Sequence, residues 1–175
     1  MKRLFLWLPL AVFIVFVAVV WVSLRSPADT NIRSQMIGKA IPPFALQPAV
    51  ASHPGLNSAN LRTGQPRLLN VFASWCGPCA IESPQLLVLR RRGIPIDAVA
   101  IRDRPEDVAR FLRDYGDPFE RIGSDPATKV QMALGSSGVP ETFVVDGKGV
   151  IRHQHIGDIR PENVPELIAA WEAAK

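Results

Sequence analysis

Apolar residues fall into one long uninterrupted run near the N-terminus and several shorter runs separated by polar turns. The long run, residues 4–24, contains 21 residues and no charge. As a helix rising about 1.5 Å per residue it would cross the roughly 30 Å core of a bilayer. The pattern therefore predicts a membrane anchor over residues 1–25. Residues 26–36 are polar without periodicity and are predicted to be a tether, followed by one globular domain over residues 37–175.

A cleaved signal peptide is the alternative interpretation of the N-terminus. Its apolar core would normally have about 7–15 residues and end at a small-residue cleavage site, and this run is longer and has no such site. Lys2 and Arg3 precede it closely, which favours an N-terminus inside the cell and a domain outside the cytoplasm. We therefore expect a single-pass protein of the cytoplasmic (inner) membrane, with its domain on the periplasmic side.

The shorter runs predict alternating strands and helices within residues 37–175. Fully apolar runs are typical of buried strands, and runs with glycine or proline at their ends and helical spacing are typical of helices. A loop rich in Pro, Ser, Asn and Gly covers residues 48–64. The predicted strands are 44–46, 67–74, 94–101 and two strands within 141–157 around a turn at Asp146-Gly147; the predicted helices are 78–92, 104–116, 125–135 and 160–175. This order predicts an α/β fold with a mixed sheet flanked by helices.

The net charge of the predicted domain argues against a nucleic-acid partner. The net charge of the chain is +4, but the segment from residue 35 onward contains 16 Lys and Arg and 15 Asp and Glu. A domain so close to neutral lacks the basic surface by which proteins bind nucleic acid. We therefore expect no nucleic-acid partner.

The two cysteines of the chain, Cys76 and Cys79, allow three interpretations. As a structural crosslink, their disulfide would close a loop too short to restrict the unfolded chain much. As a metal site, the two thiolates would need further ligands, and a copper site completed by His153 or His155 is the best version. As a redox couple, they would exchange electrons with a partner's disulfide.

The residues around the pair favour the redox interpretation. A buried strand leads into Trp75, then Cys76-Gly77-Pro78-Cys79, and then a helix. A cysteine at a helix N-terminus is stabilised as a thiolate by unpaired N–H groups and the helix dipole. Cys76 would then be the exposed nucleophile, and Cys79, one turn into the helix, the resolving cysteine.

The motif W-C-G-P-C, with Pro84 inside the following helix, resembles the thioredoxin superfamily. The stretches "GKAIPPFAL", "LLNVFASWC" and "GSSGVPETFVVDGKGVIRHQHIGDI" are similar, more narrowly, to the membrane-anchored thiol:disulfide interchange proteins of cytochrome c maturation (the CcmG/DsbE type). The resemblance covers about residues 37–175 and implies a thioredoxin-like fold. It also agrees with an N-terminal transmembrane helix.

The resemblance implies a substrate-binding surface around the cysteines. Pro140 would follow a cis peptide bond and face the pair, so that the backbone of Val139 could bind an extended segment of the partner. Trp75, Gly77 and Pro78 would complete the same surface beside Cys76.

Two acidic residues match acidic positions of the family near its active site. We expect Glu82 and Glu141 to tune the pKa of the thiols and to relay a proton to or from Cys79. Glu82 could instead lie solvated on the helix surface. Thioredoxin has a buried aspartate where this chain has Asn70, and an amide cannot act as the base.

The expected function is reduction of disulfides in apocytochrome c or its chaperone by a membrane-tethered oxidoreductase. A membrane dithiol donor would re-reduce the chain, and no cofactor is expected beyond the redox-active Cys76–Cys79 disulfide. The alternatives are a copper chaperone for oxidase assembly, and a broad-specificity thiol reductase or oxidant on the same fold.

Overall fold

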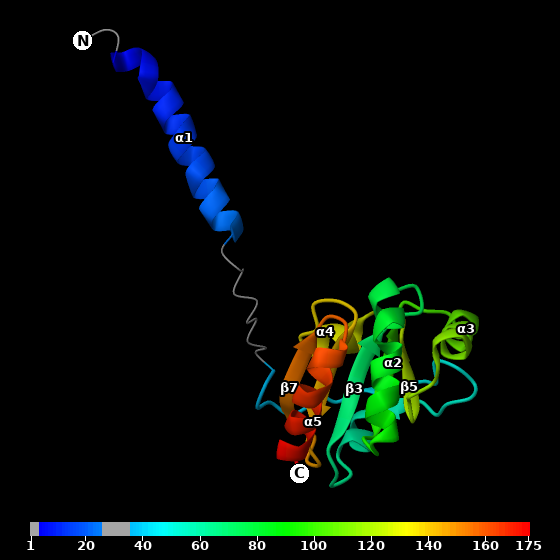
Figure 1. The fold of residues 1–175 in the computed structure, drawn as a ribbon. Helices are drawn as coiled ribbons and strands as arrows, with labels where there is room; N and C mark the ends of the chain where they lie inside the picture. The colour runs from blue at the N-terminus through cyan, green and yellow to red at the C-terminus, as the bar shows by residue number, and fades with distance from the viewer. Residues whose placement is uncertain (1–3, 26–35) are drawn as a thin grey trace. The chain divides into compact units, whose positions relative to one another are not determined.

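The computed structural model describes residues 4–25 and 36–175, in two compact units divided at residue 33 (Figure 1). In the first unit the apolar run forms one helix, α1 (Leu4–Arg25), which confirms the predicted helix. Over the described residues, no helix has the length and apolar character needed to cross a membrane. The anchoring role of this helix therefore stays a prediction. The predicted tether lies outside the described residues, apart from Met36.

The second unit has the alternating order of strands and helices that the sequence predicts. Helices α2 and α5 lie side by side on one face of the sheet (Figure 1). The strands are β1 (Ala45–Leu46), β2 (Leu56–Asn57), β3 (Arg67–Phe72), β4 (Ile96–Ile101), β5 (Arg121–Asp125), β6 (Glu141–Val145) and β7 (Ile151–Ile156). The helices are α2 (Gly77–Arg91), α3 (Pro105–Tyr115), α4 (Lys129–Ala133) and α5 (Val164–Ala173), with 3₁₀ turns η1 (Ser58–Leu61) and η2 (Pro161–Asn163).

The main sheet is mixed, in the order β5-β4-β3-β6-β7. β3, β4 and β5 are parallel, whereas β6 runs antiparallel to both β3 and β7. Every residue of β3 and β4 is buried, as expected for central strands covered on both faces. Right-handed crossovers between successive parallel strands place α2 and α3 on one face of the sheet. There, Phe111 of α3 packs 5.5 Å from Phe72 of β3, measured between ring centroids.

The sequence missed the edge strand β5 and misplaced the helix that follows it. Residues 125–135 were expected to be helical from an Asp125 cap, but Asp125 ends β5 and α4 begins only at Lys129. The Asp125 carboxylate nevertheless accepts hydrogen bonds from the backbone N–H groups of residues 129, 130 and 131. It therefore caps the helix from the end of a strand, because the intervening turn folds the chain back on itself.

The polar loop at 48–64 covers an edge of the sheet. Its N-terminal part runs beside β5, where Ser124 N–H donates to the carbonyl of Gln47 and Ala49 N–H donates to that of Ile122. Ile122 N–H in turn donates to the carbonyl of Pro54. The loop thus satisfies backbone groups that an exposed edge strand would leave unpaired.

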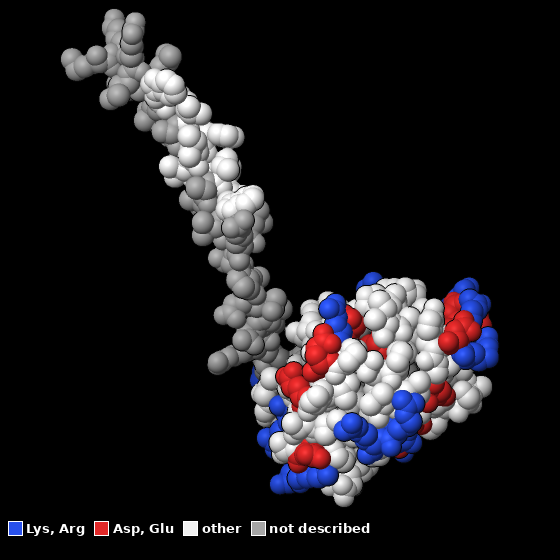
Figure 2. Space-filling model, in the orientation of Figure 1, with Lys and Arg blue, Asp and Glu red and all other residues white. Residues whose placement is uncertain are grey.

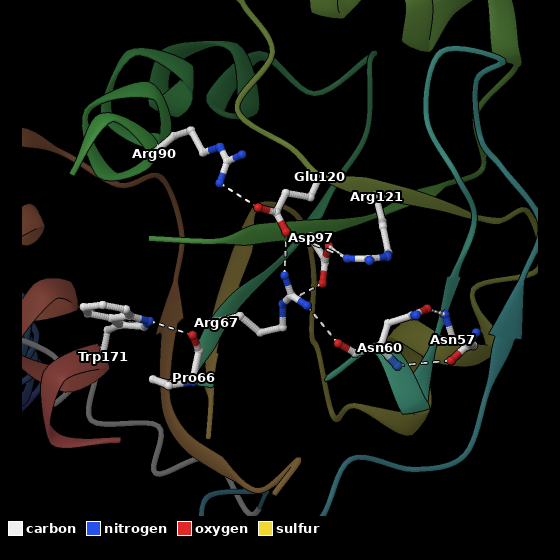
Figure 3. A network of polar contacts seen from close by, with 9 residues as sticks. All are labelled: Asn57, Asn60, Pro66, Arg67, Arg90, Asp97, Glu120, Arg121 and Trp171. Atoms are coloured by element: carbon white, nitrogen blue, oxygen red, sulfur yellow. Dashed lines mark hydrogen bonds and ion pairs between the residues drawn. The ribbon is translucent and has the colours of Figure 1, made fainter. Parts of the chain in front are cut away.

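A buried ionic network ties the strands together at the amino-terminal end of β3 (Figure 3). Arg67 pairs through Nε with Asp97 of β4 at 2.8 Å, and through a terminal nitrogen with Glu120 at 2.7 Å. Glu120 also pairs with Arg90 of α2 at 2.8 Å. Burial raises the pKa of Asp97 to about 6, although Arg67 and Arg121 oppose that rise. The network lies at the amino-terminal end of β3, and the cysteines follow its carboxyl end.

Candidate active site

Cys76 and Cys79 form a disulfide at the start of α2. Cys76 is the N-cap of the helix, and its Sγ accepts a hydrogen bond from Cys79 N–H at 3.1 Å. Cys76 retains 6% of its surface exposed and Cys79 only 1%, so Cys76 is the more accessible cysteine. A thiolate at this position would face the unpaired N–H groups of the first helical turn, which stabilise negative charge.

The topology of the sheet explains why distant segments meet at the cysteines. Cys76 follows the carboxyl end of β3, and the parallel strand β4 ends at the same edge with Ile101. Because β6 is antiparallel to β3 and Val71 pairs with Glu141, the start of β6 lies at this edge too. The peptide bond between Val139 and Pro140, just before β6, is cis, as the resemblance implied.

The surface around Cys76 is open and partly apolar. Gly77 and Pro78 are exposed, Val139 is partly exposed, and Trp75 keeps 60% of its surface exposed. Trp75 borders a cleft of about 560 Å³ between the turn that precedes α2, the segment after β4, and α3. Pro140, by contrast, is buried, so the contact surface there comes from Val139 and the backbone.

Glu82 is fully buried beneath the active site and is not solvated on the helix surface. Its Oε1 accepts a hydrogen bond from Asn70 Nδ2 at 2.9 Å, and its Oε2 accepts one from Ile159 N–H at 3.1 Å. Burial raises the pKa of Glu82 to about 7, and the two hydrogen bonds oppose that rise. A carboxyl with this pKa is partly protonated at neutral pH.

Glu141 is also buried, with 1% of its surface exposed, and both of its carboxylate oxygens accept hydrogen bonds. Its Oε1 accepts hydrogen bonds from the N–H and hydroxyl of Ser137, at 2.8 and 2.7 Å, and from Gly138 N–H at 3.2 Å. Its Oε2 accepts from Gln154 Nε2 at 2.8 Å. The bonds to Ser137 and Gly138 hold the loop that precedes Pro140.

The copper alternative finds no ligand set. Among the residues that the structure describes, no group of three or more His, Cys, Asp or Glu could hold a metal ion. The two histidines, either of which could have completed the site, make other contacts: His153 lies 3.7 Å from Glu166, and His155 Nε2 contacts the carbonyl of Asp158 at 3.3 Å.

The sequence analysis missed two residues that contact the turn before the cysteines, Arg102 and Asp103. Asp103 binds the backbone and hydroxyl of Ser74, and the carbonyl of Arg102 accepts a hydrogen bond from Trp75 Nε1 at 3.3 Å. Arg102 and Asp103 lie in a polar turn after β4, where charged residues are common because they are exposed to solvent. Only the parallel pairing of β3 with β4 brings this turn to the cysteines.

Comparison with known proteins agrees with this geometry. The Redoxin family model matches residues 36–170, which include both cysteines and the Val139-Pro140 segment. The chain belongs to the Redoxin family. This Redoxin is 36% identical over 168 residues to the thiol:disulfide interchange protein HelX of Rhodobacter capsulatus, covering 96% of this chain and 95% of that protein. It is 35% identical over 179 residues to the thiol:disulfide interchange protein DsbE of Escherichia coli K12, covering 98% and 96%.

Solved structures give the same fold. A Chlorobium tepidum protein described as a thiol:disulfide interchange protein DsbE superposes with a TM-score of 0.62 at 28% identity, covering 79% of this chain and 96% of that one. The predicted thioredoxin-like α/β fold and the predicted class of activity, thiol:disulfide exchange, are thus confirmed. The individual roles assigned to the site residues remain predictions.

Proposed function

We propose that this Redoxin is a membrane-tethered reductase that works outside the cytoplasm and reduces disulfides of apocytochrome c or of the chaperone that holds it. The observation that carries the proposal is the disulfide at the N-terminus of α2, in which Cys76 is the more accessible cysteine and has an open surface around it. Identity above 30% to proteins named HelX and DsbE over nearly the whole chain supports the same class of reaction.

In the proposed reaction, the Cys76 thiolate attacks one sulfur of the partner's disulfide. A mixed disulfide forms, and the partner's second sulfur leaves as a thiolate that takes up a proton. Cys79, as a thiolate, then attacks Cys76 Sγ and releases the partner's remaining thiolate. The partner gains two electrons and the Cys76–Cys79 disulfide is formed, which a membrane dithiol donor reduces again.

The two glutamates have different proposed roles. Glu82 follows Cys79 by three residues on α2, and its pKa of about 7 suits it to accept the Cys79 proton before the resolving attack. Glu141 acts through its hydrogen bonds to Ser137 and Gly138, which hold Val139 in place for an extended partner segment. Trp75, Gly77 and Pro78 complete the surface over which the partner lies.

The N-terminal unit is proposed to be the membrane tether. The support is the 21-residue uncharged run at 4–24, which is helical, and the basic residues that precede it. A tether would keep the domain beside a membrane-embedded electron donor, which a protein in an oxidising compartment requires to stay reduced.

A trapping experiment tests the mechanism. Cys79→Ala should leave Cys76 joined to its partner, because the resolving attack is lost, and the adducts should disappear on reduction. Cys76→Ala is the matched control, since it removes the attacking sulfur and should trap nothing. Recovery of c-type apocytochrome or its chaperone in the adducts supports the proposal, and absence of any thiol-sensitive adduct in cells contradicts it.

The reduction potential tests the direction of electron flow. A value near or below roughly −220 mV, toward the −270 mV of thioredoxin, is expected for a reductant. A value near about −120 mV, typical of a strong periplasmic oxidant, would reverse the proposed direction. The measurement is equilibration of the full-length chain in detergent with redox buffers.

A further inference from the structure

The segment that follows β4, Arg102-Asp103, holds the turn that leads into the redox disulfide. Asp103 accepts a hydrogen bond from the backbone N–H of Ser74 on one carboxylate oxygen, at 2.6 Å, and a second from the Ser74 hydroxyl on the other. The carbonyl of Arg102 accepts from Trp75 Nε1. Two consecutive residues therefore bind the two residues immediately before Cys76, and no role described so far uses these contacts.

The backbone at Arg102 is held in an unfavourable conformation. Its φ of 47° lies in the left-handed region, which residues with a Cβ adopt at a cost. Among the described residues only Thr128 is a second non-glycine example. Such a conformation persists where the surrounding contacts impose it. Here Arg102 N–H donates to the carbonyl of Asp125, and the Arg102 carbonyl accepts from Trp75 in the active-site turn.

Trp75 is a large apolar side chain that is exposed directly before Cys76 in the chain. Cys76 itself has only 6% of its surface exposed, so a partner sulfur can reach it only if the partner lies against the neighbouring surface. The indole is 60% exposed and makes one hydrogen bond, to Arg102. Its place therefore depends on the backbone from which it projects, and Asp103 fixes that backbone at Ser74.

We propose that Asp103 is a positioning residue for partner recognition: by binding Ser74 through both carboxylate oxygens, it presents Trp75 beside Cys76 in the orientation that a protein partner binds. This inference rests on the disulfide exchange proposed above. A surface already ordered before docking loses less conformational freedom on binding than one that must be ordered by the partner. A small disulfide, which covers little surface, gains nothing from this ordering.

The proposal predicts a selective loss of rate. In Asp103→Ala, the second-order rate constant with a protein-like substrate, an oxidised peptide containing C-x-x-C-H, should fall by about threefold to tenfold, the cost expected when a side chain must be immobilised at docking. The rate with the small disulfide dithiobis-nitrobenzoate should change by less than about twofold. Asp103→Asn should restore the peptide rate, because its amide oxygen can accept from Ser74 N–H and its NH₂ can donate to the hydroxyl.

Matched variants separate this role from a general effect of charge or stability. Glu172→Ala removes an exposed carboxylate on α5, outside the cleft that Trp75 borders, and should leave both rates unchanged. Ser74→Ala removes only the hydroxyl contact and should give an intermediate loss, and it carries the test if Asp103→Ala does not fold. All variants are full-length chains in detergent, with near-UV circular dichroism and thermal unfolding recorded on each.

The outcomes are distinct. A wild-type chain that reduces neither disulfide would contradict the proposed function itself. A wild-type chain that reduces both, with Asp103→Ala equal to it on the peptide, would overturn the inference alone. Equal losses on both substrates would also overturn it, because they would indicate a general effect on the disulfide and not on docking. Failure of Asp103→Asn to restore the rate would overturn the geometric role.

Discussion

Glu82 and Asn70 show how one buried pair sets the proton chemistry of the site. Asn70 of β3 donates to Glu82 of α2 and to the hydroxyl of Thr142 in β6, so a single amide joins a helix and two strands under the cysteines. Because the amide is neutral, it does not offset the burial of the carboxyl by charge. Burial therefore dominates and the pKa of Glu82 rises to about 7.

This raised pKa makes the stability of the fold depend on pH through one residue. The folded state binds the Glu82 proton more tightly than the unfolded state, in which the pKa is 4.5. The resulting stabilisation is complete below about pH 4.5 and is lost as pH rises through 7. A shift from 4.5 to about 7 corresponds to on the order of 3 kcal/mol between the two limits.

Glu82→Gln should remove this dependence because the amide stays neutral. We expect the free energy of unfolding of the variant, relative to wild type, to increase by on the order of 1–3 kcal/mol between pH 5 and pH 8. Urea unfolding of the oxidised full-length chain at the two pH values measures this difference. Glu172→Gln, an exposed position on α5, serves as the control and should give a pH-independent difference within about 0.5 kcal/mol. A Glu82→Gln difference that is equally independent of pH would contradict the assignment.

At the scale of elements, the small β1–β2 hairpin covers one end of the sheet by packing on β5. Gly123 makes this packing possible, since a Cβ built there would lie 2.7 Å from Leu46 Cβ and 3.1 Å from Leu56 Cβ. The bridge between Pro48 and Gly123 also brings the two backbones close together. The glycine in this strand therefore marks a close approach of the hairpin, which neither segment reveals alone.

Gly123→Ala should push the hairpin away from β5. We expect a loss of about 1–3 kcal/mol in the free energy of unfolding, the range typical of overpacked buried positions. Gly138→Ala is the matched control, because its added methyl would meet nothing within 4 Å. The measurement is urea unfolding with hydrogen exchange of the β5 amides, and equal stabilities of the two variants would contradict this account of the packing.

At the scale of the whole molecule, the charges of residues 35–175 nearly balance, with 16 Lys and Arg and 15 Asp and Glu. Figure 2 shows acidic and basic side chains intermixed on the visible face, without a single field of one sign. We therefore expect recognition of the proposed partner to depend on the contact surface around Cys76 and on proximity to the membrane. The proposed tether supplies proximity, because it confines the chain and its membrane partners to one surface.

The tether proposal predicts the behaviour of the full chain in cells. The wild-type chain should stay in the membrane fraction after an alkaline carbonate wash, and a chain without residues 1–25 should appear in the soluble fraction. A C-terminal reporter that is active only outside the cytoplasm should be active in the full chain. Release of the wild-type chain by carbonate, or a mature N-terminus beginning after the apolar run, would contradict the tether.

Local pattern alone determined the class of fold and the chemistry of the cysteine pair. Continuous apolar runs predicted β3 and β4, and W-C-G-P-C between a strand and a helix predicted a redox site, because both signals depend on neighbours in the chain. β5 was missed because its sequence, R-I-G-S-D, has neither a long apolar run nor clear alternation, and pairing with β4 makes it a strand.

Tertiary structure decided the environment of each side chain. The sequence placed Glu82 near the cysteines but left its burial open, and the packing of α2 over β3 and the loop containing Ile159 settled that it is enclosed. The contact between Asp103 and Ser74 joins residues 29 positions apart and exists only because parallel strands end at the same edge of the sheet. Residue type and spacing therefore specify the two cysteines. The ionisable groups near them and the surface around them follow from the pairing of segments that are distant in the sequence.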